Sequence, residues 1–368
     1  MKKIAVFLCL AVVAANMCFA GRSVAFGVEA FNNAVQMDAK GDVVFSPIGF
    51  EIDSAIMADA FDPITKAHFA ETLGVLTGIE AAYSSLYRDF AAAATNGVSF
   101  KSARAFLVPD YRKVSAAYRQ DLERNYRAEV CFLFPKTGAE AWIRSELDGE
   151  MEDFAIPHEA TRNERNSFFE ALSCHIGWAE PFPTENIRNS MMFDAREMDI
   201  CETDDWTMGR IPMADGAAFY ALMPKKGVDF AKVREAVNEK TIRELVLKHK
   251  SLVDAIVYHG PVVVGVPKMD IVSNMDLLPA LNHFKFPVKG YIRLNGDLPG
   301  REYRQVCRLR LDERGASGET IAAKSEDKQT RVDSSTRKFI LSGRFLFFIY
   351  HERTDSILVM GICDAKRK

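Results

Sequence analysis

Two His-Glu pairs and one glycine-flanked serine are the parts of this sequence whose residue types could do chemistry. His158-Glu159 and His351-Glu352 contain residues that bind zinc, and Gly315-Ala316-Ser317-Gly318 has the composition of a turn that presents a nucleophilic serine. Neither His-Glu pair has a second histidine at helical spacing, and a long polar segment follows the serine where a nucleophile turn needs a helix. The sequence therefore predicts no enzyme, and no metal or cofactor is expected.

Charge gives a second constraint. The formal net charge is -3, and no glycine-rich phosphate-binding loop occurs, so the sequence does not indicate a partner that is a nucleic acid. A run of arginines could bind a polyanion; its members are Arg301, Arg304, Arg308, Arg310 and Arg314. Alternation along a strand already explains Arg308 and Arg310 as a solvent-facing side, so the polyanion site is the weaker of the two interpretations.

The N-terminus has the pattern of an export signal. Lys2 and Lys3 precede an apolar run over residues 5–15, and Cys18-Phe19-Ala20 is a small-residue exit. The run is too short to span a bilayer. We expect cleavage after Ala20 and a secreted or periplasmic protein, monomeric and outside the membrane, with residues 21–368 as a single domain.

Helical and strand patterns are both present in the mature chain. Apolar spacing predicts helices over residues 24–35 and 114–126, and Ser46-Pro47 is a typical helix start. Short apolar runs predict strands over residues 128–134, 219–223, 261–266, 345–350 and 357–362. Strict alternation of strands and helices is absent, which favours an α+β fold.

The clearest strand covers residues 305–313, and the pattern is lost after it. Cys307, Leu309 and Leu311 share one face of this strand. From residue 315 to about residue 338 the sequence is small and charged without an apolar period, which indicates a long exposed loop.

Five cysteines follow the signal: Cys131, Cys174, Cys201, Cys307 and Cys363. Their number is odd and their spacing wide, which is typical of buried small hydrophobes rather than of a disulfide framework.

Ordered segments of the chain resemble the serpin family. They are residues 42–48, 102–108, 142–143, 178–182, 266–268, 312–315, 344–347 and 358–361. The resemblance implies an α+β fold in which about eight or nine helices surround three β-sheets, with a long reactive loop above them. It also implies a suicide-substrate inhibitor of a serine or cysteine protease. The protease cleaves the loop, which then inserts as a new central strand of the largest sheet.

The resemblance assigns roles within the loop. The hinge residues are Glu313, Arg314, Gly315, Ala316, Gly318, Thr320 and Ala322. Those facing the core after insertion (Ala316, Gly318, Thr320, Ala322) are small, whereas Lys324 and Glu326 would be buried on the same face at a cost. Family spacing gives the reactive-bond candidates Lys328, Gln329, Thr330 and Arg331, of which Lys328 and Arg331 would suit a trypsin-like target.

The resemblance also assigns a region where the sheet opens. Its residues here are Ser46, Pro47, Gly49, Glu170, Trp178, Lys268 and Gln305. Ser46 matches the family, while Gly49, Glu170 and Gln305 stand where a second serine, an asparagine and a histidine are usual. These departures, with Lys324 and Glu326, favour an alternative function as a non-inhibitory binding or carrier protein.

Overall fold

The computed structural model describes residues 24–35, 41–75, 78–93, 98–108, 114–132, 136–147, 167–246, 256–287, 303–316 and 336–367. The expected signal at residues 1–20, His158-Glu159 and residues 317–335 of the expected loop lie outside these ranges. Within them, no helix combines the length and the apolar character needed to cross a bilayer.

Helices begin where capping residues precede apolar runs. Ser46 Oγ accepts a hydrogen bond from Gly49 N at 3.1 Å and Pro47 occupies the first turn, as the sequence predicts. The helices are one over residues 24–34, α2 (Pro47–Asp59), α3 (Pro63–Leu73), α4 (Ile79–Ala93), α5 (Ala116–Asp121) with the π-helical turn η3 (Leu122–Tyr126), α6 (Lys136–Glu146), α7 (Phe230–Ala236), α8 (Glu239–Val246) and α9 (Leu278–His283).

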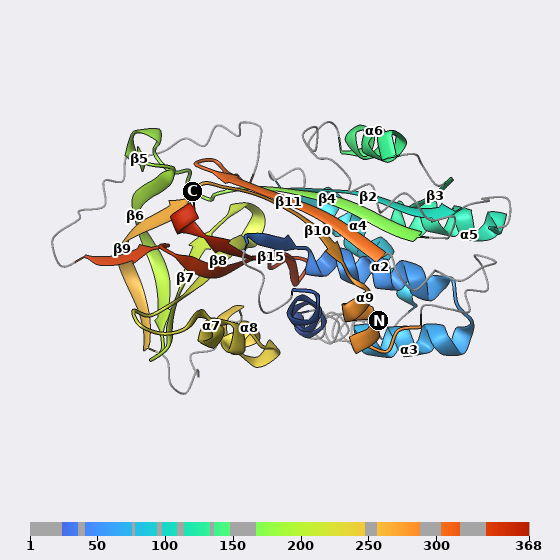
Figure 1. The fold of residues 1–368 in the computed structure, drawn as a ribbon, viewed down its shortest axis with the longest axis horizontal. Helices are drawn as coiled ribbons and strands as arrows, with labels where there is room; N and C mark the ends of the chain where they lie inside the picture. The colour runs from blue at the N-terminus through green and yellow to red at the C-terminus, as the bar shows by residue number, and fades with distance from the viewer. Residues whose placement is uncertain are drawn as a thin grey trace, which may run out of the picture.

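One sheet of six strands runs through the right-hand half of Figure 1. Its strands, in spatial order, are β10 (Met269–Asp276), β11 (Tyr303–Asp312), β12 (Gly315–Ala316), β4 (Ser167–Gly177), β2 (Val98–Val108) and β3 (Glu129–Phe132). The strand predicted around Cys307 is β11, and its apolar residues are buried as expected.

The other strands form one nine-stranded network. Its members are β1 (Val43–Phe45), β15 (Ser356–Asp364), β14 (Arg344–His351), β8 (Ala217–Pro224), β7 (Trp206–Pro212), β6 (Met191–Glu202), β9 (Ile256–Pro267), β13 (Arg337–Ile340) and β5 (Ile187–Arg188). The long strands β6 and β9 pair with each other; β6 also pairs with β7 near one end and with β5 near the other, and β13 pairs with residues 262–265 of β9. Two of the three expected sheets are therefore hydrogen-bonded into one.

The six-stranded sheet lies between two layers of helices (Figure 1). Helix α6 covers one face over a small apolar cluster, whose members are Ala103, Ala105, Ile143, Leu147, Phe169, Ala171 and Val306. The opposite face packs on α2 and the main core. Alternate residues of β2, β4 and β11 therefore point to α6 or to α2.

Helix α2 carries charge into this core. All of its residues are buried, including Glu51, Asp53 and Asp59. Burial of a carboxylate is costly without a partner, so the neighbouring strands must supply one. The five cysteines predicted to be small hydrophobes are free thiols, and all except the half-buried Cys131 are buried.

Candidate functional site

Strands β4 and β11 lie side by side, in parallel, in the middle of the six-stranded sheet. They pair directly over residues 168–173 of β4 and 303–308 of β11, and we call this stretch the seam. Beyond the seam β12 lies between the two strands, where Ala316 pairs with Ile176 of β4 and Leu311 of β11. The sheet is thus already entered at one end by the residues that directly follow β11.

The turn from β11 into β12 depends on glycine. Gly315 has φ +140°, and a Cβ there would lie 2.3 Å from the Ile176 carbonyl oxygen and 2.5 Å from Gly177 Cα. Asp312 Oδ1 accepts a hydrogen bond from the Gly315 amide at 3.3 Å, which tightens the turn. Ala316 then enters the main core with 2% of its surface exposed. Only a residue without a side chain permits this approach of backbone to backbone.

Trp178 and Lys268 hold the same turn from outside. Trp178 donates through Nε1 to the Asp312 carbonyl at 2.8 Å and through its amide to the Arg314 carbonyl at 2.9 Å. Lys268 Nζ lies 2.5 Å from Glu313 Oε2, and the bond from Lys268 lowers the pKa of that carboxyl. Two of the predicted opening residues, Trp178 and Lys268, therefore meet the first hinge residues at this end of the sheet.

A glutamine joins the two strands within the seam. Gln305 Oε1 accepts from Ser46 N at 2.8 Å, and Gln305 Nε2 donates to Ser46 O at 3.1 Å and to Glu170 Oε2 at 2.8 Å. Gln305 and Glu170 face each other directly across the seam. Ser46 Oγ in turn donates to the Leu358 carbonyl at 2.7 Å, which ties α2 to β15.

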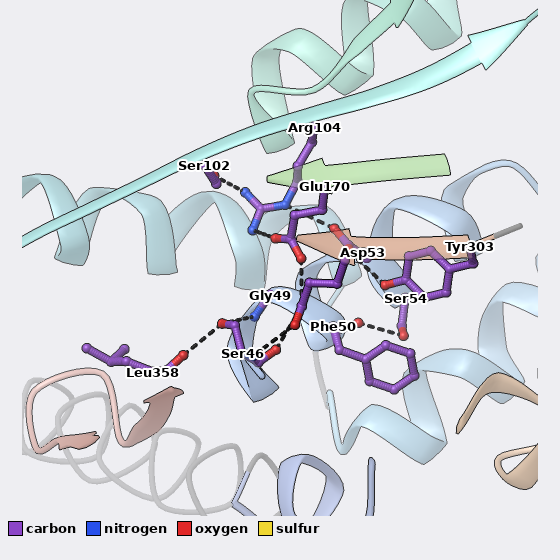
Figure 2. A network of polar contacts seen from close by, with 11 residues as sticks. Ser46, Gly49, Phe50, Asp53, Ser54, Ser102, Arg104, Glu170, Tyr303 and Leu358 are labelled. Carbon is purple, nitrogen blue, oxygen red and sulfur yellow. Dashed lines mark hydrogen bonds and ion pairs between the residues drawn. The ribbon is translucent and has the colours of Figure 1, made fainter. Parts of the chain in front are cut away.

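Charged groups extend this network below the sheet (Figure 2). Arg104 of β2 donates through Nε to Asp53 Oδ1 at 3.0 Å and through Nη2 to Glu170, and Tyr303 donates to Asp53 Oδ2 at 2.6 Å. Burial, followed by the charge of Glu170, raises the pKa of Asp53 well above its usual value, against the opposing effect of Arg104. The six residues of this central cluster are Ser46, Asp53, Arg104, Glu170, Tyr303 and Gln305.

Gly49 makes room for the cluster. A Cβ at this position would lie 2.7 Å and 2.8 Å from the two Glu170 carboxylate oxygens and 3.0 Å from Gln305 Nε2. The glycine on α2 and the glutamate on β4 are therefore a matched pair, since any larger residue at position 49 would displace the carboxylate.

The comparisons with known proteins agree with this architecture. The family model described as "Serpin (serine protease inhibitor)" matches residues 22–364. The chain belongs to the serpin family. No curated protein sequence matches it.

Solved serpin structures share its fold at low sequence identity. Serpin48 of the insect Tenebrio molitor, described as highly specific, has a TM-score of 0.74 at 17% identity and covers 94% of this chain and 97% of its own. The thermophilic serpin tengpin in its native state gives 0.74 at 16% identity, with 94% and 93% covered. Human thyroxine-binding globulin, described as complexed with thyroine, gives a TM-score of 0.74 at 16% identity, with 94% and 97% covered. The α+β serpin fold expected from the sequence is confirmed.

The structure brings most of the predicted opening region of this serpin into two groups. Ser46, Gly49, Glu170 and Gln305 meet at the seam, with Pro47 in the first turn of α2. Trp178 and Lys268 lie at the β11–β12 turn with Glu313, Arg314, Gly315 and Ala316. The remaining loop residues lie outside the described ranges; they are Gly318, Thr320, Ala322, Lys324, Glu326, Lys328, Gln329, Thr330 and Arg331.

Sequence reasoning missed Arg104, Asp53 and Tyr303. A signal for Arg104 exists, because it shares a strand face with Phe106 and Val108, and a lone arginine on an apolar face needs a buried partner. Asp53 lies on the buried helix and offered no comparable signal, since helix periodicity alone does not reveal that every face is covered.

Arg308 of the arginine run and His351 of the remaining His-Glu pair are both buried among structural contacts. Arg308, predicted as a solvent-facing residue, is instead buried with a bidentate pair to Asp270 at 2.9 Å and 2.8 Å, because β10 runs beside it. His351 is buried and contacts Thr354 Oγ1 at 2.9 Å. In the part of the chain that the structure describes, no group of three metal-ligating side chains forms.

Proposed function

We propose that this serpin is a suicide-substrate inhibitor of an extracellular or periplasmic serine or cysteine endopeptidase. The protease nucleophile attacks a carbonyl carbon of the loop, the peptide bond breaks and its amine half leaves, and the acyl-enzyme forms. The freed loop then enters the sheet as a strand and distorts the attached enzyme before water can hydrolyse the ester.

The observation that carries this proposal is β12, the start of the loop, already between β4 and β11. Because β12 is antiparallel to both strands, each step forward along the loop is a step backward along its neighbours. In the inserted strand, the core-facing residues after Ala316 would each lie between one residue of β4 and one of β11. Gly318 would lie between Cys174 and Leu309, Thr320 between Leu172 and Cys307, and Ala322 between Glu170 and Gln305. These three residues are small enough for a packed interior.

The bond that the protease attacks lies among Lys328, Gln329, Thr330 and Arg331. Cleavage after Lys328 or Arg331 would require a pocket with a carboxylate, as trypsin-like enzymes have. We therefore propose a trypsin-like target first.

Covalent trapping tests the inhibitory function. The protein is incubated with a panel of trypsin-like, chymotrypsin-like and cysteine proteases, and complexes that survive denaturing electrophoresis are counted. Thr320→Arg should convert the inhibitor into a substrate, because its side chain would face the core after insertion. Ser317→Arg, on the opposite face of the same strand and beside the exposed Arg310, should still trap the protease. Normal trapping by Thr320→Arg would contradict the insertion register.

A non-inhibitory binding or carrier function is the second candidate. The charged central cluster favours it, because separating β4 from β11 must break the bond between Gln305 and Glu170 in a buried setting. Thyroxine-binding globulin, one of the similar structures, is a serpin that binds a small molecule. Cleavage of the loop by the panel proteases, with no covalent complex formed by any of them, would support this candidate.

We further propose that residues 1–20 direct export and that the mature protein acts as a monomer. Its N-terminus should be Gly21, which N-terminal sequencing of protein from the culture medium or periplasm checks. An N-terminus at Met1 would contradict the export proposal.

A further inference from the structure

Lys324 is the residue of the loop that fits an apolar sheet interior least well, and its place after insertion can be derived. The inference rests on the proposed insertion of the cleaved loop. If the inserted loop continues in the register of β12, residue 324 lies between Phe168 on β4 and Tyr303 on β11, and we call these three positions a row. Its side chain points to the α2 face, as that of Ala316 does.

Before insertion, the aromatic rings of Phe168 and Tyr303 contact each other at this row. The Phe168 and Tyr303 rings lie 5.7 Å apart between centroids, and Tyr303 donates to Asp53 below them. A strand placed between β4 and β11 moves them apart by about 4.8 Å. The ring contact and the bond from Gln305 to Glu170 are then both lost.

The positive charge near the carboxylates of Asp53 and Glu170 does not balance their negative charge. Within the described ranges, Asp53 and Glu170 have a single cationic partner, Arg104, and all three side chains are at most 1% exposed. The cluster therefore holds one carboxylate more than its guanidinium can balance. Before insertion, burial and the charge of Glu170 already raise the pKa of Asp53 well above its usual value, which disfavours a second buried negative charge.

We propose that the carboxylates of Asp53 and Glu170 are a preformed binding site for the Lys324 ammonium group in the loop-inserted state. Lysine and tyrosine side chains have similar reach, so an ammonium in the row of Tyr303 arrives at the depth of Asp53. Its three donors replace the hydrogen bond that Gln305 withdraws from Glu170 and add bonds to Asp53. Its apolar stem fills the space between the separated rings.

This site explains two departures from the family pattern together. A glutamate stands at position 170 and a lysine at position 324, and each alone would be an uncompensated charge in the inserted state. With Asp53 and Arg104 they form a group of two carboxylates and two cations. Gly49 belongs to the same arrangement, because it gives the Glu170 carboxylate its space.

The pairing is tested by whether one substitution lowers or raises the stability that the protein gains when the loop is cleaved. Full-length protein is nicked after Arg331 with an arginine-specific protease, the cut is verified by mass spectrometry, and guanidinium unfolding midpoints of intact and nicked forms are compared. Lys324→Met should lower the gain in midpoint on nicking by roughly 0.5 M, because a buried partner is lost. If the buried ammonium had no partner, Lys324→Met would instead raise the gain in midpoint, because methionine removes an unpaired buried charge.

Two controls make the outcomes distinct. Ser317→Ala, on the opposite face of the inserted strand, should leave the gain unchanged. In an Asp53→Asn background the effect of Lys324→Met should fall to less than half. A gain kept or raised in Lys324→Met, or the same loss in both backgrounds, would overturn the pairing while insertion stands. No gain in the wild-type protein would overturn insertion itself, and the pairing with it.

Discussion

The two ends of the boundary between β4 and β11 are built differently. At the β11–β12 turn, small residues already separate the strands, and the contacts there include backbone hydrogen bonds, the bond from the Trp178 indole to the Asp312 carbonyl and the ion pair of Lys268 with Glu313. At the seam, buried charged and amide groups bond across the strands. Under the proposed mechanism, this difference means that the loop would enter the sheet beside β12 and would then have to break the buried hydrogen bonds of the central cluster.

The largest effect should come from removing the one cation that the cluster carboxylates share. Arg104→Met leaves Asp53 and Glu170 buried without it, and we expect unfolding free energy to fall by about 3–5 kcal/mol. Guanidinium unfolding of the intact protein measures this. Arg308→Met, whose partner Asp270 is half exposed, is the matched control and should cost about 1 kcal/mol or less. Equal losses in both variants would remove the distinction between the seam and its surroundings.

A methyl group on α2 should disturb the seam without removing a charge. Gly49→Ala places a Cβ against the Glu170 carboxylate, and we expect a loss of about 1–3 kcal/mol from overpacking. Gly41→Ala is the control, because no atom lies within 4 Å of a Cβ there. Comparable stability of the two variants, by thermal unfolding, would show that the carboxylate can move freely.

At the turn, removal of one donor should have a smaller effect. Trp178→Phe keeps the packing but leaves the Asp312 carbonyl without its indole partner, which costs about 1 kcal/mol. Amide hydrogen exchange should rise in residues 311–316 and not in residues 303–308. Faster exchange in both ranges would mean that the two regions open together.

The smallest effect should come from the exposed ion pair. Lys268→Met should cost at most about 1 kcal/mol. The folded pKa of Glu313 is lowered by Lys268, so this contribution is present above the unfolded pKa and lost as pH falls through the folded one. The stability difference between Lys268→Met and wild type should therefore vanish in acid. A difference that persists there would assign the role of Lys268 to packing.

Local patterns predicted much of the fold. Alternation identified β11, the Ser46-Pro47 pair identified the start of α2, and the family resemblance gave the order of the remaining elements. The same reasoning identified Glu170 and Gln305 as unusual. It could not show that they hydrogen-bond to each other, because they lie 135 positions apart and their bond depends on the register of two strands.

The charged part of the cluster was less predictable. Arg104 and Asp53 belong to a strand and a helix 51 positions apart, and neither local pattern contains information on the other. Arg308 was predicted to face solvent because alternation does not show that β10 lies beside it. Residues whose environment comes from several elements thus escape one-dimensional patterns.

The most direct test of the central claim is the thermal unfolding of intact and loop-cleaved protein. Limited trypsin digestion, with the cut located near Lys328 or Arg331 by mass spectrometry, provides the cleaved form. We predict a large rise in melting temperature on cleavage, because the loop completes the sheet from β12 through the seam. An unchanged melting temperature would mean that the seam stays closed after cleavage, and it would contradict the inhibitory mechanism.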